Sequence, residues 1–155
     1  MKNVVDFLTG NLILNTAIIA WAMAQIIKLF VTRVVEGRWD WKHILSSGGM
    51  PSSHSAAVCA TAASVGYLYG LSTPLFAVAA VMAVVVMYDA ANVRRETGKQ
   101  AIILNYMMEH WDEGKPVEFE KALKELIGHT PLQVLMGALL GIAVGWGGVW
   151  LVTVR

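Results

Sequence analysis

Four long apolar stretches constrain this chain more than any other feature of its sequence. They cover about residues 12–35, 52–71, 75–91 and 131–152, and a helix of about 17–25 residues crosses a bilayer core of roughly 30 Å. Only 15% of the residues are charged, whereas a soluble domain carries about 25%. In lipid, a helix satisfies its own backbone polar groups. We therefore predict an all-α, polytopic membrane helical bundle with about four transmembrane helices plus short interfacial helices, forming one domain over residues 1–155.

The N-terminal segment has two possible interpretations. Lys2, the apolar run after it and the small residues Ala22 and Ala24 are typical of a secretory signal peptide. However, the apolar run continues to Val35, which is longer than the apolar core of a signal peptide. We predict an uncleaved membrane helix.

Basic residues indicate how the predicted bundle is oriented. Most of them fall on the side where the second span begins: Arg33, Arg38, Lys42, Arg94, Arg95, Lys99, Lys115, Lys121 and Lys124. Only Lys2 and Arg155 fall on the other side. Because cytoplasmic loops carry an excess of Lys and Arg, we predict a cytoplasmic segment 92–130, which first continues the third helix, with both termini outside. We expect a bacterial inner membrane protein. The net charge of +1 makes nucleic acid an unexpected partner.

Small residues predict close helix packing in two of the spans. The second span is rich in Ala, Ser and Gly, and Gly137, Gly141 and Gly145 repeat every four residues in the last one. Such a face lets two helix backbones approach closely. The sequence leaves open whether this face packs inside the chain or forms a homodimer.

The most distinctive polar stretch, residues 46–55, reads Ser-Ser-Gly-Gly-Met-Pro-Ser-Ser-His-Ser. Its glycines let the backbone approach a ligand, and Pro51 suits the first turn of a helix. A helix start carries partial positive charge and binds phosphate, to which Ser52 and Ser53 add hydroxyl groups. His54 can exchange a proton near neutral pH. A polar loop that only caps a helix is an equally good interpretation of this stretch alone.

A second helix start carries a second histidine. Thr130 suits the N-cap and Pro131 the first helical position, directly after His129. The predicted topology places His54 and His129 on one side of the membrane. One can attack phosphorus while the other protonates the leaving oxygen. The predicted phosphate-binding residues around them are Lys28, Arg33, Ser52, Ser53, Arg94, Arg95 and Lys99.

Acidic residues can support this site, although simpler roles exist. Glu125 can orient His129, and Asp89 either orients a histidine or, as we favour, pairs with Arg94 or Arg95. Basic residues at a cytosolic interface also serve merely to fix topology. No Cys-x-x-Cys or His-Glu-x-x-His spacing occurs, so we predict neither a metal nor another cofactor.

Three segments together resemble a known family. Residues 49–54, Gly-Met-Pro-Ser-Ser-His, resemble the Pro-Ser-Gly-His motif of the type 2 phosphatidic acid phosphatase superfamily, which also contains vanadium-dependent haloperoxidases. With Tyr88-Asp89-Ala90-Ala91-x-x-Arg94-Arg95 and Gly128-His129-Thr130-Pro131, the chain is similar to the small divergent bacterial and plant branch. The similarity runs from about Gln25 to Gly141.

The resemblance implies that His54 is the general acid and that His129 is a nucleophile forming phosphohistidine without a metal. The sequence departs from the family pattern in three places: no Arg-Pro follows Lys28, no Ser-Arg precedes His129, and Gln133 stands where an Asp is expected. Arg94 and Arg95 can replace the missing arginine.

Two functions therefore remain open. The first is a membrane-embedded, metal-independent phosphatase that acts on a phosphatidyl- or prenyl-type lipid phosphate. The second is a non-catalytic lipid-phosphate binding or transport protein that keeps the anion site. A purely structural membrane protein would explain the glycine repeat but not the two histidines at helix starts.

Overall fold

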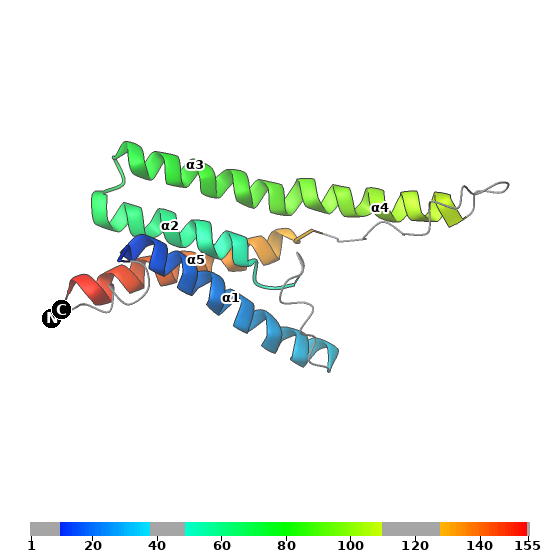
Figure 1. Ribbon diagram of the computed structural model, residues 1–155, viewed down its shortest axis with the longest axis horizontal. Helices are drawn as coiled ribbons and strands as arrows, with labels where there is room; N and C mark the ends of the chain where they lie inside the picture. The colour runs from blue at the N-terminus through cyan, green and yellow to red at the C-terminus, as the bar shows by residue number, and fades with distance from the viewer. Residues whose placement is uncertain (1–9, 38–48, 110–127, 155) are drawn as a thin grey trace.

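The computed structural model describes residues 10–37, 49–109 and 128–154, and all its regular elements are helices (Figure 1). The elements are α1 (Leu12–Glu36), α2 (Ser53–Tyr69), α3 (Pro74–Tyr88), the π-helical turn η3 (Asp89–Val93), α4 (Arg94–Glu109) and α5 (Pro131–Thr153). The prediction of an all-α membrane bundle is confirmed.

Three helical segments are long and apolar enough to cross a membrane: Leu12–Val35, Pro74–Met108 and Pro131–Thr153. The sequence predicts about four spans, but α2 has only 17 residues and so rises about 25 Å. It begins late because Ser52 caps it, and it ends early because Gly70 leaves the helical conformation with φ 91°. α2 is therefore shorter than the predicted stretch 52–71.

The helix starts depend on side-chain caps rather than on propensity alone. The side chains of Asn11, Ser52, Thr73 and Thr130 each accept a hydrogen bond from a backbone N–H of the first turn, satisfying a donor that has no partner within the helix. The expected place of Pro51 in the first helical turn is wrong. Pro51 precedes the capping residue, because the Ser52 side chain takes over the N-cap position.

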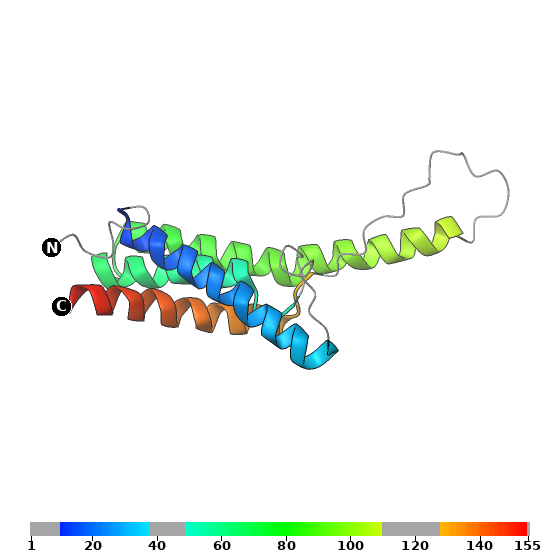
Figure 2. The ribbon, with the colours of Figure 1, turned by 60° about the horizontal axis from the view of Figure 1, so that its bottom comes forward.

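α2 forms the centre of the bundle. It packs against α1, α3 and most extensively α5, while α1 also contacts α5 (Figure 2). α3 packs mainly on α2 and leaves most of its apolar side chains exposed, among them Val78, Val81 and Val85. In a membrane protein these side chains face lipid.

The glycine repeat of α5 packs against the backbone of α2. A Cβ atom added at Gly137, Gly141 or Gly145 would collide with the carbonyl oxygen of Ser52, Ala56 or Ala60, respectively. Of the two possibilities that the sequence leaves open, the structure therefore has the glycine face packed inside the chain. A homodimer through this face would have to displace α2.

A buried polar contact ties the other end of α2 to its neighbours. The Ser64 hydroxyl lies 2.8 Å from the Thr16 hydroxyl of α1 and donates to the Gly145 carbonyl of α5 at 3.2 Å. Hydrogen bonds between helices help to hold a membrane bundle whose outer surface is already apolar.

The third helix does not stop where its apolar stretch ends. α3, η3 and α4 form one continuous rod that runs beyond the rest of the bundle (Figure 1). As predicted, the polar residues after Ala91 continue the helix. The π turn within this rod was not expected from the sequence.

Candidate active site

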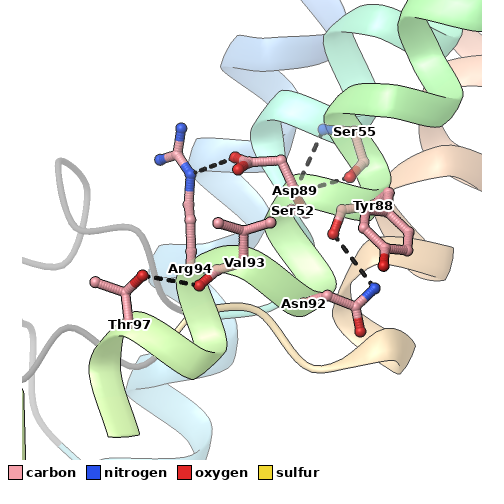
Figure 3. A network of polar contacts seen from close by, with 8 residues as sticks. All are labelled: Ser52, Ser55, Tyr88, Asp89, Asn92, Val93, Arg94 and Thr97. Atoms are coloured by element: carbon pink, nitrogen blue, oxygen red, sulfur yellow. Dashed lines mark hydrogen bonds and ion pairs between the residues drawn. The ribbon is translucent and has the colours of Figure 1, made fainter. Parts of the chain in front are cut away.

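The start of α2 is fixed to the start of α5. The Ser52 N–H donates to the carbonyl of Gln133 at 3.0 Å, and its hydroxyl oxygen lies 3.0 Å from the hydroxyl of Ser55, which donates to it. Ser52 is fully buried (0% exposed) and Ser53 nearly so (3%). Figure 3 shows Ser52 and Ser55 turned toward each other. The Ser52 hydroxyl thus serves as a cap, a role distinct from the predicted phosphate contact.

His129 lies directly before this start of α5 and is 2% exposed. Its Nδ1 atom is 3.2 Å from Oε1 of Gln133, and the backbone of Gly49 also forms a hydrogen bond with the ring. Burial lowers the pKa of His129, and the charges of Lys28 and His54 lower it further, whereas the bonds with Gln133 and Gly49 act in the opposite direction. The structure therefore favours a neutral imidazole here.

Lys28 reaches the same region from α1. It is 2% exposed, and both histidines lie within electrostatic range of its ammonium group. Gly49 covers its aliphatic stem, because a Cβ atom at position 49 would come within 3.0 Å of Lys28 Cγ. The loop before α2 therefore passes directly over a buried cation.

His54 occupies the first turn of α2 and, unlike His129, is exposed. His54 lies within electrostatic range of Arg94, Lys28 and Asp89. His129 in turn lies within electrostatic range of His54. Residues from α1, α2, η3, α4 and the start of α5 thus meet at one end of the bundle. As predicted, His54 and His129 each lie at the start of a helix.

The π turn aligns a charged pair beside His54. Arg94 Nε lies 2.8 Å from Asp89 Oδ2 (Figure 3). Residues five apart in an α-helix are about 140° apart around the axis, so they do not normally meet, but the wider π turn brings them to one side. Asp89 therefore forms the ion pair favoured from sequence, with Arg94 rather than Arg95.

Side chains support the backbone of this widened turn. The Asn92 amide donates to the Tyr88 carbonyl at 3.4 Å, and the Thr97 hydroxyl donates to the Val93 carbonyl at 2.9 Å (Figure 3). Gly128 packs against the start of α4, where an added Cβ atom would clash with the backbone nitrogen of Arg95. Gly128, directly before His129, thus lies in close contact with the helix that carries Arg94 and Arg95.

The other predicted site residues have local roles or lie elsewhere. Arg33 donates to the Gly37 carbonyl at the end of α1, and Lys99 pairs with Glu96 at 2.7 Å on exposed α4. Glu125 lies outside the described residues. Among the described residues, no group of three or more His, Cys, Asp or Glu side chains is arranged to hold a metal ion.

Comparison with known proteins identifies the family. A family model described as "Divergent PAP2 family" matches residues 9–144, a range that contains every site residue named above. The chain belongs to this family. It is 43% identical over 145 residues to the "Uncharacterized membrane protein YuiD" of Bacillus subtilis (strain 168), covering 87% of this chain and 92% of the relative. No solved structure matches the chain.

Membership of the Divergent PAP2 family confirms the resemblance inferred from sequence, and a membrane location agrees with the description of the relative. The sequence did not predict the contacts that two further residues, Gln133 and Gly49, make in the site. Gln133 was noted only as a departure from the family pattern, although Thr130-x-x-Gln133 is a capping-box sequence that would have placed its side chain near His129. No local signal indicated that Gly49 would cover Lys28.

Proposed function

We propose that this protein is a membrane-embedded phosphatase that hydrolyses a phosphatidyl- or prenyl-type lipid phosphate. The observation that carries the proposal is the meeting of His54 and His129 at two adjoining helix starts, beside Lys28 and Arg94. Family membership suggests phosphatase-related chemistry. The lipid tail would lie along the apolar surface of the bundle while its phosphate reaches the charged end.

In the proposed reaction, an unprotonated ring nitrogen of His129 attacks phosphorus. The bond between phosphorus and the lipid oxygen breaks, and His54 gives that oxygen a proton, so the lipid leaves as an alcohol. His54 then takes a proton from water, whose oxygen attacks phosphohistidine and releases inorganic phosphate. Lys28, Arg94 and Arg95 would offset the charge on the phosphate oxygens.

The active face is proposed to be cytoplasmic in a bacterial inner membrane, with both termini outside and the chain acting as one domain. Because the cations already neutralise the phosphate, turnover is expected to survive excess chelator. Strict dependence on magnesium would contradict this mechanism.

A test of covalent catalysis uses rapid quench of purified protein with radiolabelled lipid phosphate. We expect acid-labile label on the wild type and none on His129→Ala, which should still bind phosphate through the remaining cations. His54→Ala should slow turnover by about 10²–10⁴, and less for a substrate whose leaving group needs no proton. Turnover without labelling would indicate direct attack by water.

The second candidate is a non-catalytic lipid-phosphate binder or transporter. A specific observation favours it: the position four residues after His129 carries the neutral Gln133 rather than an aspartate. Phosphate binding without turnover of any lipid phosphate in a broad panel would establish this function instead.

A further inference from the structure

One side chain contacts both the start of α5 and the buried histidine. Oε1 of Gln133 accepts a hydrogen bond from the Thr130 N–H at 3.0 Å and lies 3.2 Å from Nδ1 of His129. In return, the Gln133 N–H donates to the Thr130 hydroxyl at 3.4 Å. The two residues form a complete capping box.

The capping box settles which end of the Gln133 amide faces the ring. Amide oxygen and nitrogen are assigned from their hydrogen-bond partners. The Thr130 N–H can only donate, so the atom facing it is the oxygen, and the same oxygen faces His129 Nδ1. An amide oxygen only accepts, so a hydrogen bond between the two requires a proton on Nδ1.

We propose that Gln133 is a positioning residue that holds neutral His129 with its proton on Nδ1, leaving the lone pair on Nε2. The use of this Nε2 lone pair for attack on phosphorus rests on the function proposed above, but the assignment of the tautomer does not. A free imidazole prefers its proton on the other nitrogen, so the native preference has to come from contacts such as this one.

The neutral character of Gln133 matters as much as its position. A carboxylate there would also accept from Nδ1, but its negative charge would stabilise the imidazolium form. Lys28 and His54 act on the ring as positive charges, and the amide adds no charge against them. Gln133 thus fixes the proton position while leaving the ring neutral, the form that a nucleophile needs.

The competing contact is the backbone of Gly49, which also hydrogen-bonds the ring. If the Gly49 carbonyl instead took a proton from Nε2, the preferred tautomer would be reversed. The two possibilities place the proton on different ring nitrogens, and ¹⁵N chemical shifts of the ring distinguish them.

The experiment measures ¹⁵N chemical shifts of labelled histidine in the full-length protein in detergent micelles, at alkaline pH where the ring is neutral. His129→Ala assigns the signals. We expect protonated Nδ1 and unprotonated Nε2 in the wild type and in Gln133→Glu, with loss of this preference in Gln133→Leu. Thr130→Ala is the matched control, because it removes one capping bond but keeps the Gln133 contact with the ring.

A proton on Nε2 in the wild type would overturn the inference, as would an unchanged tautomer in Gln133→Leu. The same spectra titrated with pH should show a higher His129 pKa in Gln133→Glu than in the wild type. An unchanged or lower pKa there would overturn the statement about charge.

Turnover separates this inference from the proposed function. If the wild type hydrolyses lipid phosphate, Gln133→Leu should lower kcat on the order of 10²-fold with little change in KM, as expected when a histidine loses its orienting partner. Thr130→Ala should keep most activity. A wild type with the expected tautomer but no turnover would support the role of Gln133 and contradict the phosphatase.

Discussion

Gly49 combines two constraints in a single residue. Its φ of +90° is one that L side chains rarely adopt, and its missing side chain leaves room for the stem of Lys28. Gly37 has a similar φ of +73° but nothing within 4 Å of an added Cβ atom. Substitution at Gly37 therefore tests backbone strain alone, whereas substitution at Gly49 tests strain combined with a close contact.

We expect Gly49→Ala to lower the free energy of unfolding by about 1–3 kcal/mol through backbone strain, plus the cost of displacing Lys28. Gly37→Ala should show the strain alone and so have a smaller effect. Denaturant titration in detergent measures both variants. Equal losses would mean that the Lys28 stem moves aside without cost.

At the scale of residues, the sequence indicated which side chains can take part in catalysis but not which residues they contact. His54 and His129 could be found because helix-start signals stand beside them in the sequence. A pair between Asp89 and either Arg94 or Arg95 was expected, but its geometry was not, because nothing in Asp-Ala-Ala-Asn-Val indicates a π turn. Lys28 was expected among the phosphate-binding residues, but nothing in its sequence neighbourhood indicated that Gly49 would cover it.

At the scale of elements, η3 determines where Arg94 points. A π turn is equivalent to one extra residue in an α-helix, and each α-helical residue turns the chain by about 100°. Inserting one alanine after Ala91 should turn the helix beyond it by about 100°, separate Asp89 from Arg94, and move the guanidinium away from His54. We expect phosphate binding, measured by calorimetry with inorganic phosphate, to weaken by about tenfold or more, the worth of one charge-assisted hydrogen bond.

Asp89→Ala is the matched control for this insertion, because it removes the pair while leaving the register unchanged. Arg94 then stays beside His54 and phosphate binding should be retained. Comparable losses in both variants would show that the ion pair, and not the π turn, places the arginine. Circular dichroism checks that both proteins remain helical.

The contact between α2 and α5 is the most extensive in the bundle. It leads to opposite expectations for two glycines of α5. A Cβ atom at Gly141 would collide with the Ala56 carbonyl, whereas one at Gly147 would meet nothing within 4 Å. Gly141→Ala should therefore destabilise the protein by roughly 1–3 kcal/mol. Gly147→Ala should be neutral or stabilising by up to about 1 kcal/mol, because Ala favours the helix.

Thermal unfolding in detergent distinguishes the two variants. A Gly141→Ala protein as stable as the wild type would mean that α2 and α5 can separate slightly without loss. The sequence could predict a close glycine face but not its partner, because a spacing of four residues says nothing about which helix lies opposite.

For the whole molecule, hydropathy was enough to predict an all-helical membrane bundle, since lipid leaves few alternatives for the backbone. It was less informative about the length of α2, which depends on Ser52 and Gly70 at its ends. The convergence at the charged end depends on contacts between residues far apart in sequence, such as Ser52 with Gln133, and periodicity does not encode these.

The proposed orientation can be tested because the single cysteine, Cys59, is buried. Ser72→Cys would place a thiol on the exposed turn between α2 and α3, and Gln100→Cys would place one on exposed α4. In right-side-out spheroplasts, a membrane-impermeant maleimide should label the first variant only. Labelling of Gln100→Cys alone would place the charged end outside the cell, and the wild type serves as the background control.

The link between α2 and α5 has a consequence for how the protein is made. A ribosome delivers α2 before α5, so in the growing chain the face of α2 that the α5 glycines later cover has no occupant from this bundle. His129 and Gln133 also arrive only with α5. A nascent chain that has not yet reached α5 therefore carries the arginines and His54 without His129 and Gln133, so the proposed site forms only after α5 has been made.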